Sequence, residues 1–129
     1  MANPNIVSVA TIEGGNLGWN LTNTLTTQLM TVTAEYVVKV NRIMCTNIHA
    51  TDSANLNLYI TKVNATPAGV TNFDTSGDFY LAKVIAVPAN ASLVVSDTPI
   101  YLMEGDSLKG GSSASSTLDL FVSYETLID

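Results

Sequence analysis

Positive charge is scarce in this 129-residue chain. Five Lys and Arg residues stand against eleven Asp and Glu, which gives a formal net charge of −6 at pH 7. A nucleic-acid-binding surface needs clustered cations to neutralise phosphates, and so does a surface held on an anionic membrane by charge. The composition therefore argues against nucleic acid and against a membrane as partners.

Cysteine and long apolar runs are also missing. Cys45 is the single cysteine, so the chain cannot form an intramolecular disulfide or a multi-cysteine zinc site. No apolar run approaches the roughly 20 residues needed to span a bilayer. The first residues lack the basic and apolar regions of a secretory signal. We expect a chain that is made and folded in a cytoplasm.

Uncharged polar residues take the place of the missing charges. Charged residues supply only 12% of the chain, whereas Thr (16), Asn (12) and Ser (11) are abundant. A surface of hydroxyls and amides can be covered by a partner at lower desolvation cost than a charged surface. The 47% of apolar residues suffices for one hydrophobic core. We therefore expect a single domain over residues 1–129, with residues 1–5 as an N-terminal arm.

Apolar residues recur with a period of two, which predicts β-strands. The clearest strand is 117–125, where Phe121 alone breaks the alternation, and similar runs cover 6–12, 56–61 and 79–87. Between Tyr36 and His49 the apolar residues change face, which predicts a bulge near Asn41 and Arg42 or a passage from one strand into another. No segment has the 3.6-residue period of an amphipathic helix.

Turn-forming residues separate these runs. They occupy 13–16, 51–54, 64–77, 88–90, 97–99, 104–106 and 109–116. Seven to nine short strands joined by such turns predict an all-β fold, an antiparallel two-sheet β-sandwich or jelly roll. We expect the long segment 64–77 and the Gly-Ser tract 110–116 to be loops that contact a partner.

No set of residues forms a convincing catalytic site. The only histidine, His49, could pair with Asp52, but a single imidazole at a strand end is usually a surface residue. Gly105-Asp-Ser-Leu108 spells the tetrapeptide of a serine esterase family, but its surroundings lack the α/β pattern and the downstream histidine of that triad. We interpret it as a turn and assign no catalytic residue.

Metal and cofactor sites are equally weak. The segment Asp74-Thr-Ser-Gly-Asp78 has oxygen ligands typical of a calcium loop, but it lacks the full carboxylate series. One histidine and one cysteine cannot make an ordinary zinc site in a monomer, although a trimer could supply three copies of His49 at an axis. We assign no metal and no cofactor.

Two runs are apolar on both faces, 79–87 and 93–95. Such a run is either a central strand or an edge strand that another sheet or chain must cover. Lysine, which usually guards exposed edges, occurs only four times. These features favour a homo-oligomer, and we expect a trimer.

The chain from residue 40 onward resembles small virion proteins of tailed bacteriophages, including those that infect cyanobacteria. The resemblance rests on Val40-Asn-Arg-Ile-Met-Cys-Thr-Asn47, Leu81-Ala-Lys-Val-Ile-Ala-Val-Pro-Ala-Asn-Ala-Ser-Leu-Val-Val95 and Asp97-Thr-Pro-Ile-Tyr-Leu-Met-Glu-Gly-Asp-Ser-Leu108. It continues through the ending Val122-Ser-Tyr-Glu125 and covers about two-thirds of the chain. It implies a β-sandwich component of the virion, such as a capsid cement (decoration) protein, a neck or tail accessory protein, or a fibre-attachment module.

Among these roles we favour capsid cement, with the major capsid protein or other virion proteins as partners beside the chain itself. This hypothesis assigns partner contacts to the arm and to the two loops. The contact residues are Ala2, Asn3, Pro4, Asn5, Phe73, Asp74, Lys109, Gly110 and Gly111. A carbohydrate-binding module is the second class, which predicts an exposed Trp19 clustered with tyrosines at one loop end. An enzyme would need a pocket that joins His49 to an acidic residue.

Overall fold

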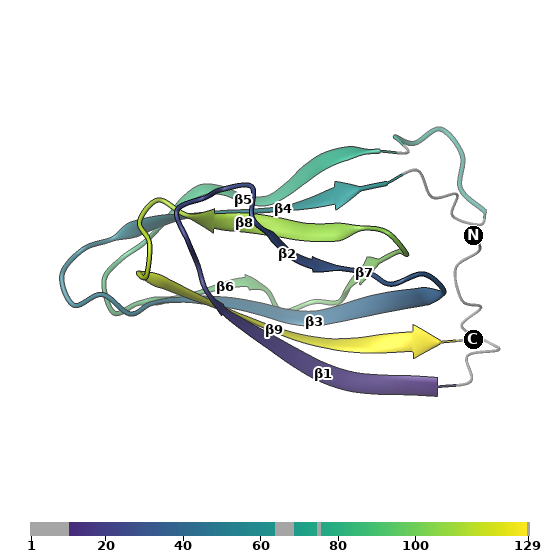
Figure 1. The fold of residues 1–129 in the computed structure, drawn as a ribbon, viewed down its shortest axis with the longest axis horizontal. Coiled ribbons are helices and arrows are strands. Elements are labelled where there is room, and N and C mark those ends of the chain that lie inside the picture. The colour runs from purple at the N-terminus through teal and green to yellow at the C-terminus, as the bar shows by residue number, and fades with distance from the viewer. Residues whose placement is uncertain (1–10, 64–68, 75, 129) are drawn as a thin grey trace.

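The computed structural model describes residues 11–63, 69–74 and 76–128, which contain nine β-strands and no helix. None of these residues belongs to a helix that could cross a membrane. The strands run along the long axis of the molecule, and most turns gather at its two ends (Figure 1). The strands are β1 (Thr11–Asn20), β2 (Gln28–Thr31), β3 (Tyr36–Asn47), β4 (Ala54–Lys62), β5 (Gly77–Val87), β6 (Ser92–Ser96), β7 (Ile100–Leu102), β8 (Ser107–Ser112) and β9 (Leu118–Ile128).

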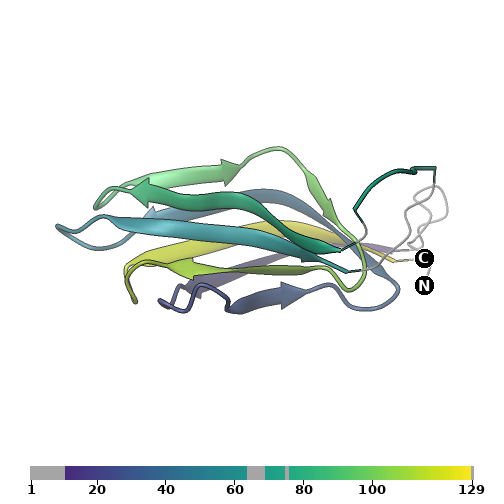
Figure 2. The same ribbon diagram turned by 90° about the horizontal axis from the view of Figure 1, so that it is seen from above.

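Two antiparallel sheets face each other (Figure 2). Sheet A has the order β1-β9-β3-β6, with β7 also paired to β3, and sheet B has the order β2-β8-β4-β5. Because β6 and β7 pair with successive parts of β3, they act as one interrupted strand along its edge. Counted in this way, the eight strands change sheet at every connection except the one from β4 to β5, which is the connectivity of a jelly roll. The predicted antiparallel β-sandwich is confirmed.

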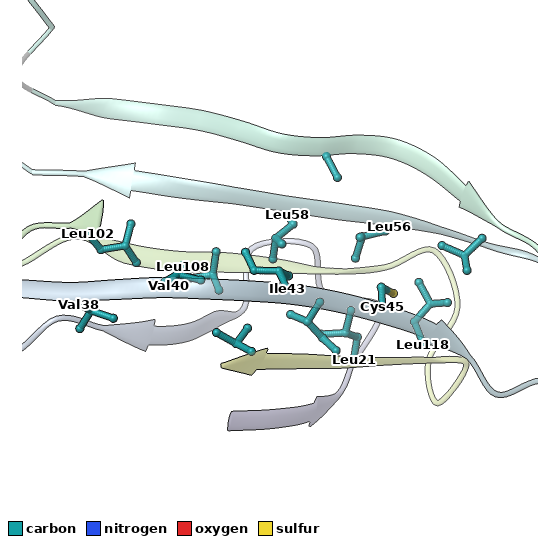
Figure 3. Packing of buried hydrophobic residues seen from close by; sticks show 14 of the residues in the cluster. Leu21, Val38, Val40, Ile43, Cys45, Leu56, Leu58, Leu102, Leu108 and Leu118 are labelled. Carbon is teal, nitrogen blue, oxygen red and sulfur yellow. The ribbon is translucent and has the colours of Figure 1, made fainter. Parts of the chain in front are cut away.

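The hydrophobic core lies between the sheets and comes from the inward residues of β3, β4, β8 and β9 (Figure 3). Its largest fully buried apolar side chains are Leu21, Ile43, Leu56, Leu58, Leu102, Leu108, Leu118, Leu120, Val87 and Val122. Full burial of each such side chain contributes about 1.5–3 kcal/mol relative to exposure. This layer explains why the period-two pattern of the sequence is so regular in the central strands.

Two local predictions about strands are confirmed. In β9, Leu118, Leu120 and Val122 are at most 1% exposed, whereas Phe121 on the opposite face is 51% exposed. In β3, the register with β9 shifts between Val40 and Arg42, so Asn41 is the extra residue of a bulge. The bulge lets apolar residues on both sides of it reach the same core.

The prediction that residues 13–16 form a turn was wrong, because they lie inside β1. Gly15 is required there by packing, since a Cβ at this position would lie 2.7 Å from Cζ of Tyr124. The glycine therefore makes room for an aromatic ring of the neighbouring strand. Of the predicted run 6–12, only Thr11 and Ile12 fall within the described residues.

The prediction that residues 109–116 form a loop was wrong for its first four residues, which belong to β8 in the middle of sheet B. Gly110 and Gly111 are buried. A Cβ at Gly110 would collide with the backbone carbonyl of Asn57, and one at Gly111 would lie 2.7 Å from the carbonyl oxygen of Thr24. The two glycines allow neighbouring backbones to approach the strand, and the turn begins only at Ser113.

Candidate interaction surface

The two strands that are apolar on both faces lie at the edges of their sheets. Strand β5 pairs only with β4 among the described strands, and β6 pairs only with β3. The two edges lie on the same side of the sandwich, where β5 and β6 contact each other. Of the two alternatives raised by the sequence, edge strand or central strand, the structure selects the edge.

This side exposes large apolar side chains, which we call the β5 surface. Its members are 41–58% exposed although they belong to paired strands. They are Phe79, Tyr80, Val84 and Ile85 on β5, Val94 on β6 and Tyr101 on β7. Apolar groups gathered on sheet edges mark interaction sites or aggregation hazards in soluble proteins.

Strand β5 carries two bulges relative to β4. Leu56 pairs with Ile85 and Leu58 with Ala82, so the single residue Asn57 faces two residues of β5. The side-chain oxygen of Asn57 accepts a hydrogen bond from the backbone N–H of Val84 at 3.2 Å. A side chain of β4 thus supplies a partner where the regular ladder is interrupted.

Val84 adopts a left-handed backbone conformation, with φ of 54°. This region is rare for a β-branched residue because its side chain collides with the backbone, and such a conformation costs on the order of 1–3 kcal/mol. The side chain of Val84 is nevertheless 58% exposed, so packing inside this protomer does not repay the strain. Strain of this kind clusters at functional sites.

Aromatic and cationic groups cover the outer face of sheet B beside this bulge. The rings of Tyr59 and Tyr80 lie 4.9 Å apart, and the Lys83 ammonium lies 5.0 Å from the centre of the Tyr80 ring. Tyr59 is only 6% exposed, and burial raises its pKa, with smaller contributions from Asp78 and Tyr80. Lys109 pairs with Tyr59 from the adjacent strand β8.

His49 serves the turn between β3 and β4. Its Nδ1 accepts backbone hydrogen bonds from Thr51 at 3.2 Å and from Asp52 at 3.0 Å. The proton of the neutral ring therefore sits on Nε2, which lies 3.8 Å from a carboxylate oxygen of Asp52. The structure does bring His49 and Asp52 together, but on an exposed turn where the ring organises the backbone.

The esterase-like tetrapeptide has structural partners. Asp106 is buried, and its carboxylate accepts backbone hydrogen bonds from Val63 and Met103. The hydroxyl of Ser107 lies 3.0 Å from that of Thr31. Ser107 begins β8 at the end of the sandwich opposite His49, so these residues cannot act as a catalytic pair.

Within the described part of the chain, the structure adds no metal ligand to the candidate calcium loop. It also does not place Trp19 in the exposed aromatic cluster that a carbohydrate-binding module would need. Among the described residues no three His, Cys, Asp or Glu side chains group as a metal site requires. A carboxylate oxygen of Asp78 accepts a hydrogen bond from the Thr61 hydroxyl at 2.7 Å. Trp19 packs partly buried against the core instead of joining an exposed loop-end platform.

The predicted contact residues do not form one site. Phe73 is partly buried and Asp74 exposed in the segment before β5, and Lys109 lies on the outer face of sheet B. Gly110 and Gly111 are buried within this protomer. Ala2, Asn3, Pro4 and Asn5 lie outside the described residues.

Sequence reasoning identified the apolar run on β5 but missed Lys83 over Tyr80 and the strained Val84. The only signal for them was the lysine that interrupts the run. Comparison with known protein families, curated proteins and solved structures finds no match for this chain. The interpretation of the β5 surface therefore depends on its own geometry.

Proposed function

We propose that the chain is a non-enzymatic structural protein of a bacteriophage virion, and specifically a capsid cement protein. It would bind the outer capsid surface and stabilise the contacts between capsomers. The sequence resemblance to phage virion proteins points to the particle, and the β-sandwich suits a rigid building block. Jelly rolls serve viral capsids and lectins alike, so the fold is compatible with this role by analogy without selecting it.

The observation that carries the proposal is the strained and exposed Val84. A β-branched residue with φ of 54° and 58% exposure lowers the stability of the isolated protomer without filling its core. Such a residue makes sense when a partner covers it in the assembled state. Tyr80 on the outer face of sheet B, and Phe79 and Ile85 on the opposite face of β5, supply further exposed apolar area along the same strand.

The proposed partners are other copies of the chain and the major capsid protein. A trimer at a local threefold axis would cover the β5 surface of each copy and present three identical capsid-binding surfaces. Because all three bind together, each contact can be modest. The binding needs no charge neutralisation, which agrees with the low content of charged residues.

Binding to capsids that lack the protein tests this role. We expect Val84→Asn and Tyr80→Ser to lower capsid occupancy while the proteins remain folded. Val84→Asn should at the same time raise the free energy of unfolding by about 1 kcal/mol, because Asn tolerates the left-handed region. Ile48→Asn is the matched control, since Ile48 is β-branched and 52% exposed but lies outside both the β5 surface and the predicted contact loops. Full occupancy by both β5 variants would refute the assignment.

A variant that lacks Met1 to Asn5 tests the proposed arm in the same assay. Undiminished occupancy would remove the arm from the set of contacts. The stoichiometry in purified particles separates capsid cement from a neck, tail or fibre-attachment protein. Hundreds of copies would support cement, whereas about a dozen would place the chain at the neck or tail.

A carbohydrate-binding module is the second candidate, and Tyr80 is the observation that favours it. Tyr80 is 50% exposed, and a sugar face could stack on its ring once the Lys83 ammonium that lies over it moves away. This function predicts glycan-dependent adsorption to cells that Tyr80→Ser abolishes. Adsorption that is independent of glycans would exclude it.

A further inference from the structure

Strand β1 is a long sheet edge without the usual protection against pairing. It pairs with β9 over all ten residues with no register shift, and no other described strand pairs with its free side. It contains no Lys and no Pro, and its only charged residue is Glu13. Proteins normally guard such edges with lysine, proline, bulges or short length.

The other sheet edges do carry such guards. Strand β5 has two bulges and Lys83, β2 has only four residues, and Pro99 interrupts the edge formed by β6 and β7. Only β1, among the strands that the structure describes, offers a regular edge of full length. It lies on the side of the sandwich opposite the β5 surface.

We propose that β1 pairs antiparallel with β1 of a second copy about a twofold axis. In the pairing that places Gly15 opposite Gly15 of the second copy, Ile12 faces Gly18. Because β1 has no bulge, these two residues share the outer face of sheet A. Ile12 is 62% exposed in the single protomer.

The outer face of sheet A has a depression at the position where Ile12 of the second copy would lie. Its floor and walls include Gly18, Met44 and the half-exposed ring of Phe121. A Cβ at Gly18 would lie 3.4 Å from the Phe121 ring, so the absence of a side chain on β1 leaves this space open. The twofold axis makes the fit occur twice, with each Ile12 packed against the other copy's Phe121.

A second depression lies on the inner side of β1, where the two sheets part. Leu17, Met30, Tyr36 and Tyr124 line it, and a second copy along β1 would close it. Each face of β1 therefore has one apolar residue and one depression: Ile12 and the first depression on the outer face, and Leu17 and the second depression on the inner face. This arrangement suits a strand of matching chemistry better than a small ligand.

Charge also permits this pairing. Glu13 would face Leu17 of the second copy, and the two Glu13 carboxylates would be separated by four residues of strand, roughly 13 Å. That separation exceeds the screening length of about 8 Å at physiological salt, so they repel only weakly. A pairing centred on Glu13 would oppose them directly and is disfavoured.

The contact is small. A ten-residue edge is about 33 Å long, and the opposed edges of the two sheets are about 10 Å thick, so each copy would bury on the order of 400–600 Å². This is the range of weak and transient interfaces. We therefore expect a dimer that forms at high concentration, and in a capsid the pairing would join one oligomer to the next. Only that last role depends on the proposed function.

Sedimentation velocity of the full chain from about 1 to 500 µM tests the pairing without any capsid. Asn16 is exposed at the centre of β1, and the two copies of this position would lie roughly 7 Å apart along the paired strands, so Asn16→Lys would bring two positive charges together across the axis. We expect Asn16→Lys and Asn16→Asp each to weaken the β1 association about 10-fold. An equimolar mixture of the two should restore it. Ser53→Lys, in the exposed turn between β3 and β4 and away from both the β1 edge and the β5 surface, is the control and should leave association unchanged.

Cross-linking tests the register. Gly14→Cys meets no atom within 4 Å, and residue 14 would lie directly opposite Asn16 of the second copy. Mild oxidation of a mixture of Gly14→Cys and Asn16→Cys proteins should give a disulfide-linked heterodimer, whereas Gly14→Cys mixed with Asn23→Cys should not.

Equal association of wild type, Asn16→Lys and Asn16→Asp at every concentration would overturn the proposal. So would a loss of unfolding stability in Asn16→Lys without a change in association, because the edge would then be covered within one chain. If β1 pairing is refuted, the capsid-binding assay of the β5 surface still tests the proposed function. If capsid binding is refuted, sedimentation and cross-linking still test β1 pairing, so the two proposals can fail independently.

Discussion

The ring of Tyr124 lies directly over the backbone of Gly15. The two residues are cross-strand neighbours of β9 and β1, and a Cβ on Gly15 would come within 2.7 Å of both Cζ and Oη of the tyrosine. Tyr124 in turn packs against the core. The glycine therefore lets a large aromatic side chain close the core beside an edge strand.

Gly15→Ala should destabilise the protein by about 1–2 kcal/mol, because the tyrosine ring must move out of a packed position. Gly14→Ala is the matched control. No atom lies within 4 Å of its Cβ, so we expect a neutral or slightly stabilising change of up to about 0.5 kcal/mol. Urea unfolding of both variants measures the difference, and equal stabilities would contradict the packing role of Gly15.

Gly110→Ala should be more harmful than Gly15→Ala. The new methyl group would collide with the carbonyl of Asn57 and lie 3.0 Å from the Cα of Leu58, and backbone cannot rotate away as a ring can. We expect a loss of about 3 kcal/mol. Circular dichroism and urea unfolding check this, and a loss below that of Gly15→Ala would show that β8 can shift.

Asn47 holds one end of the sandwich together. Its amide nitrogen donates to the carbonyl oxygens of Asp52 and Val87, each at 2.9 Å, and its side-chain oxygen accepts from the backbone N–H of His49. The residue is 1% exposed. Asn47→Ala leaves three backbone groups without this partner and should cost about 3 kcal/mol.

The exposed Asn23 provides the control for this variant, since Asn23→Ala should change stability by less than about 0.5 kcal/mol. Thermal unfolding followed by circular dichroism compares the two. A similar melting temperature for both variants would mean that water replaces the Asn47 amide at no cost.

Cys45 should make stability fall at high pH. Burial, with a smaller contribution from Asp119, raises the pKa of the thiol from 9.0 to about 11. Below pH 9 the Cys45 thiol is protonated in both the folded and the unfolded state, so its full contribution to the free energy of unfolding is present. Above it the unfolded chain ionises first, so the free energy of unfolding decreases until about pH 11. The total loss is roughly 2–3 kcal/mol.

Urea unfolding between pH 8 and pH 11 measures this slope, and Cys45→Ala should remove the cysteine's part of it while other groups still titrate. The folded protein should also react slowly with thiol reagents at pH 8, because the side chain is 0% exposed. Parallel slopes for the wild type and the variant would refute the assignment to Cys45.

Much of the β5 surface was accessible to sequence reasoning. The run 79–87 is apolar on both faces, and that pattern already restricts it to a central strand or a covered edge. The choice between the two could not be made locally, because it depends on which distant strand pairs with β5. The strain at Val84 was also hidden, since the residue lies in a bulge that is defined only by the pairing of β5 with β4.

The sequence by itself determined the all-β class, the alternation of β9 and the change of face between Tyr36 and His49, because each follows from which side chains can face one core along a single strand. Only the tertiary structure decided which strands lie at the edges and why glycines occur within them. The order of strands in a sheet brings together residues that are far apart in the chain, such as Gly15 and Tyr124. In the sequence alone, the glycines of β1 predict a turn, because the aromatic ring that requires Gly15 comes from a distant strand.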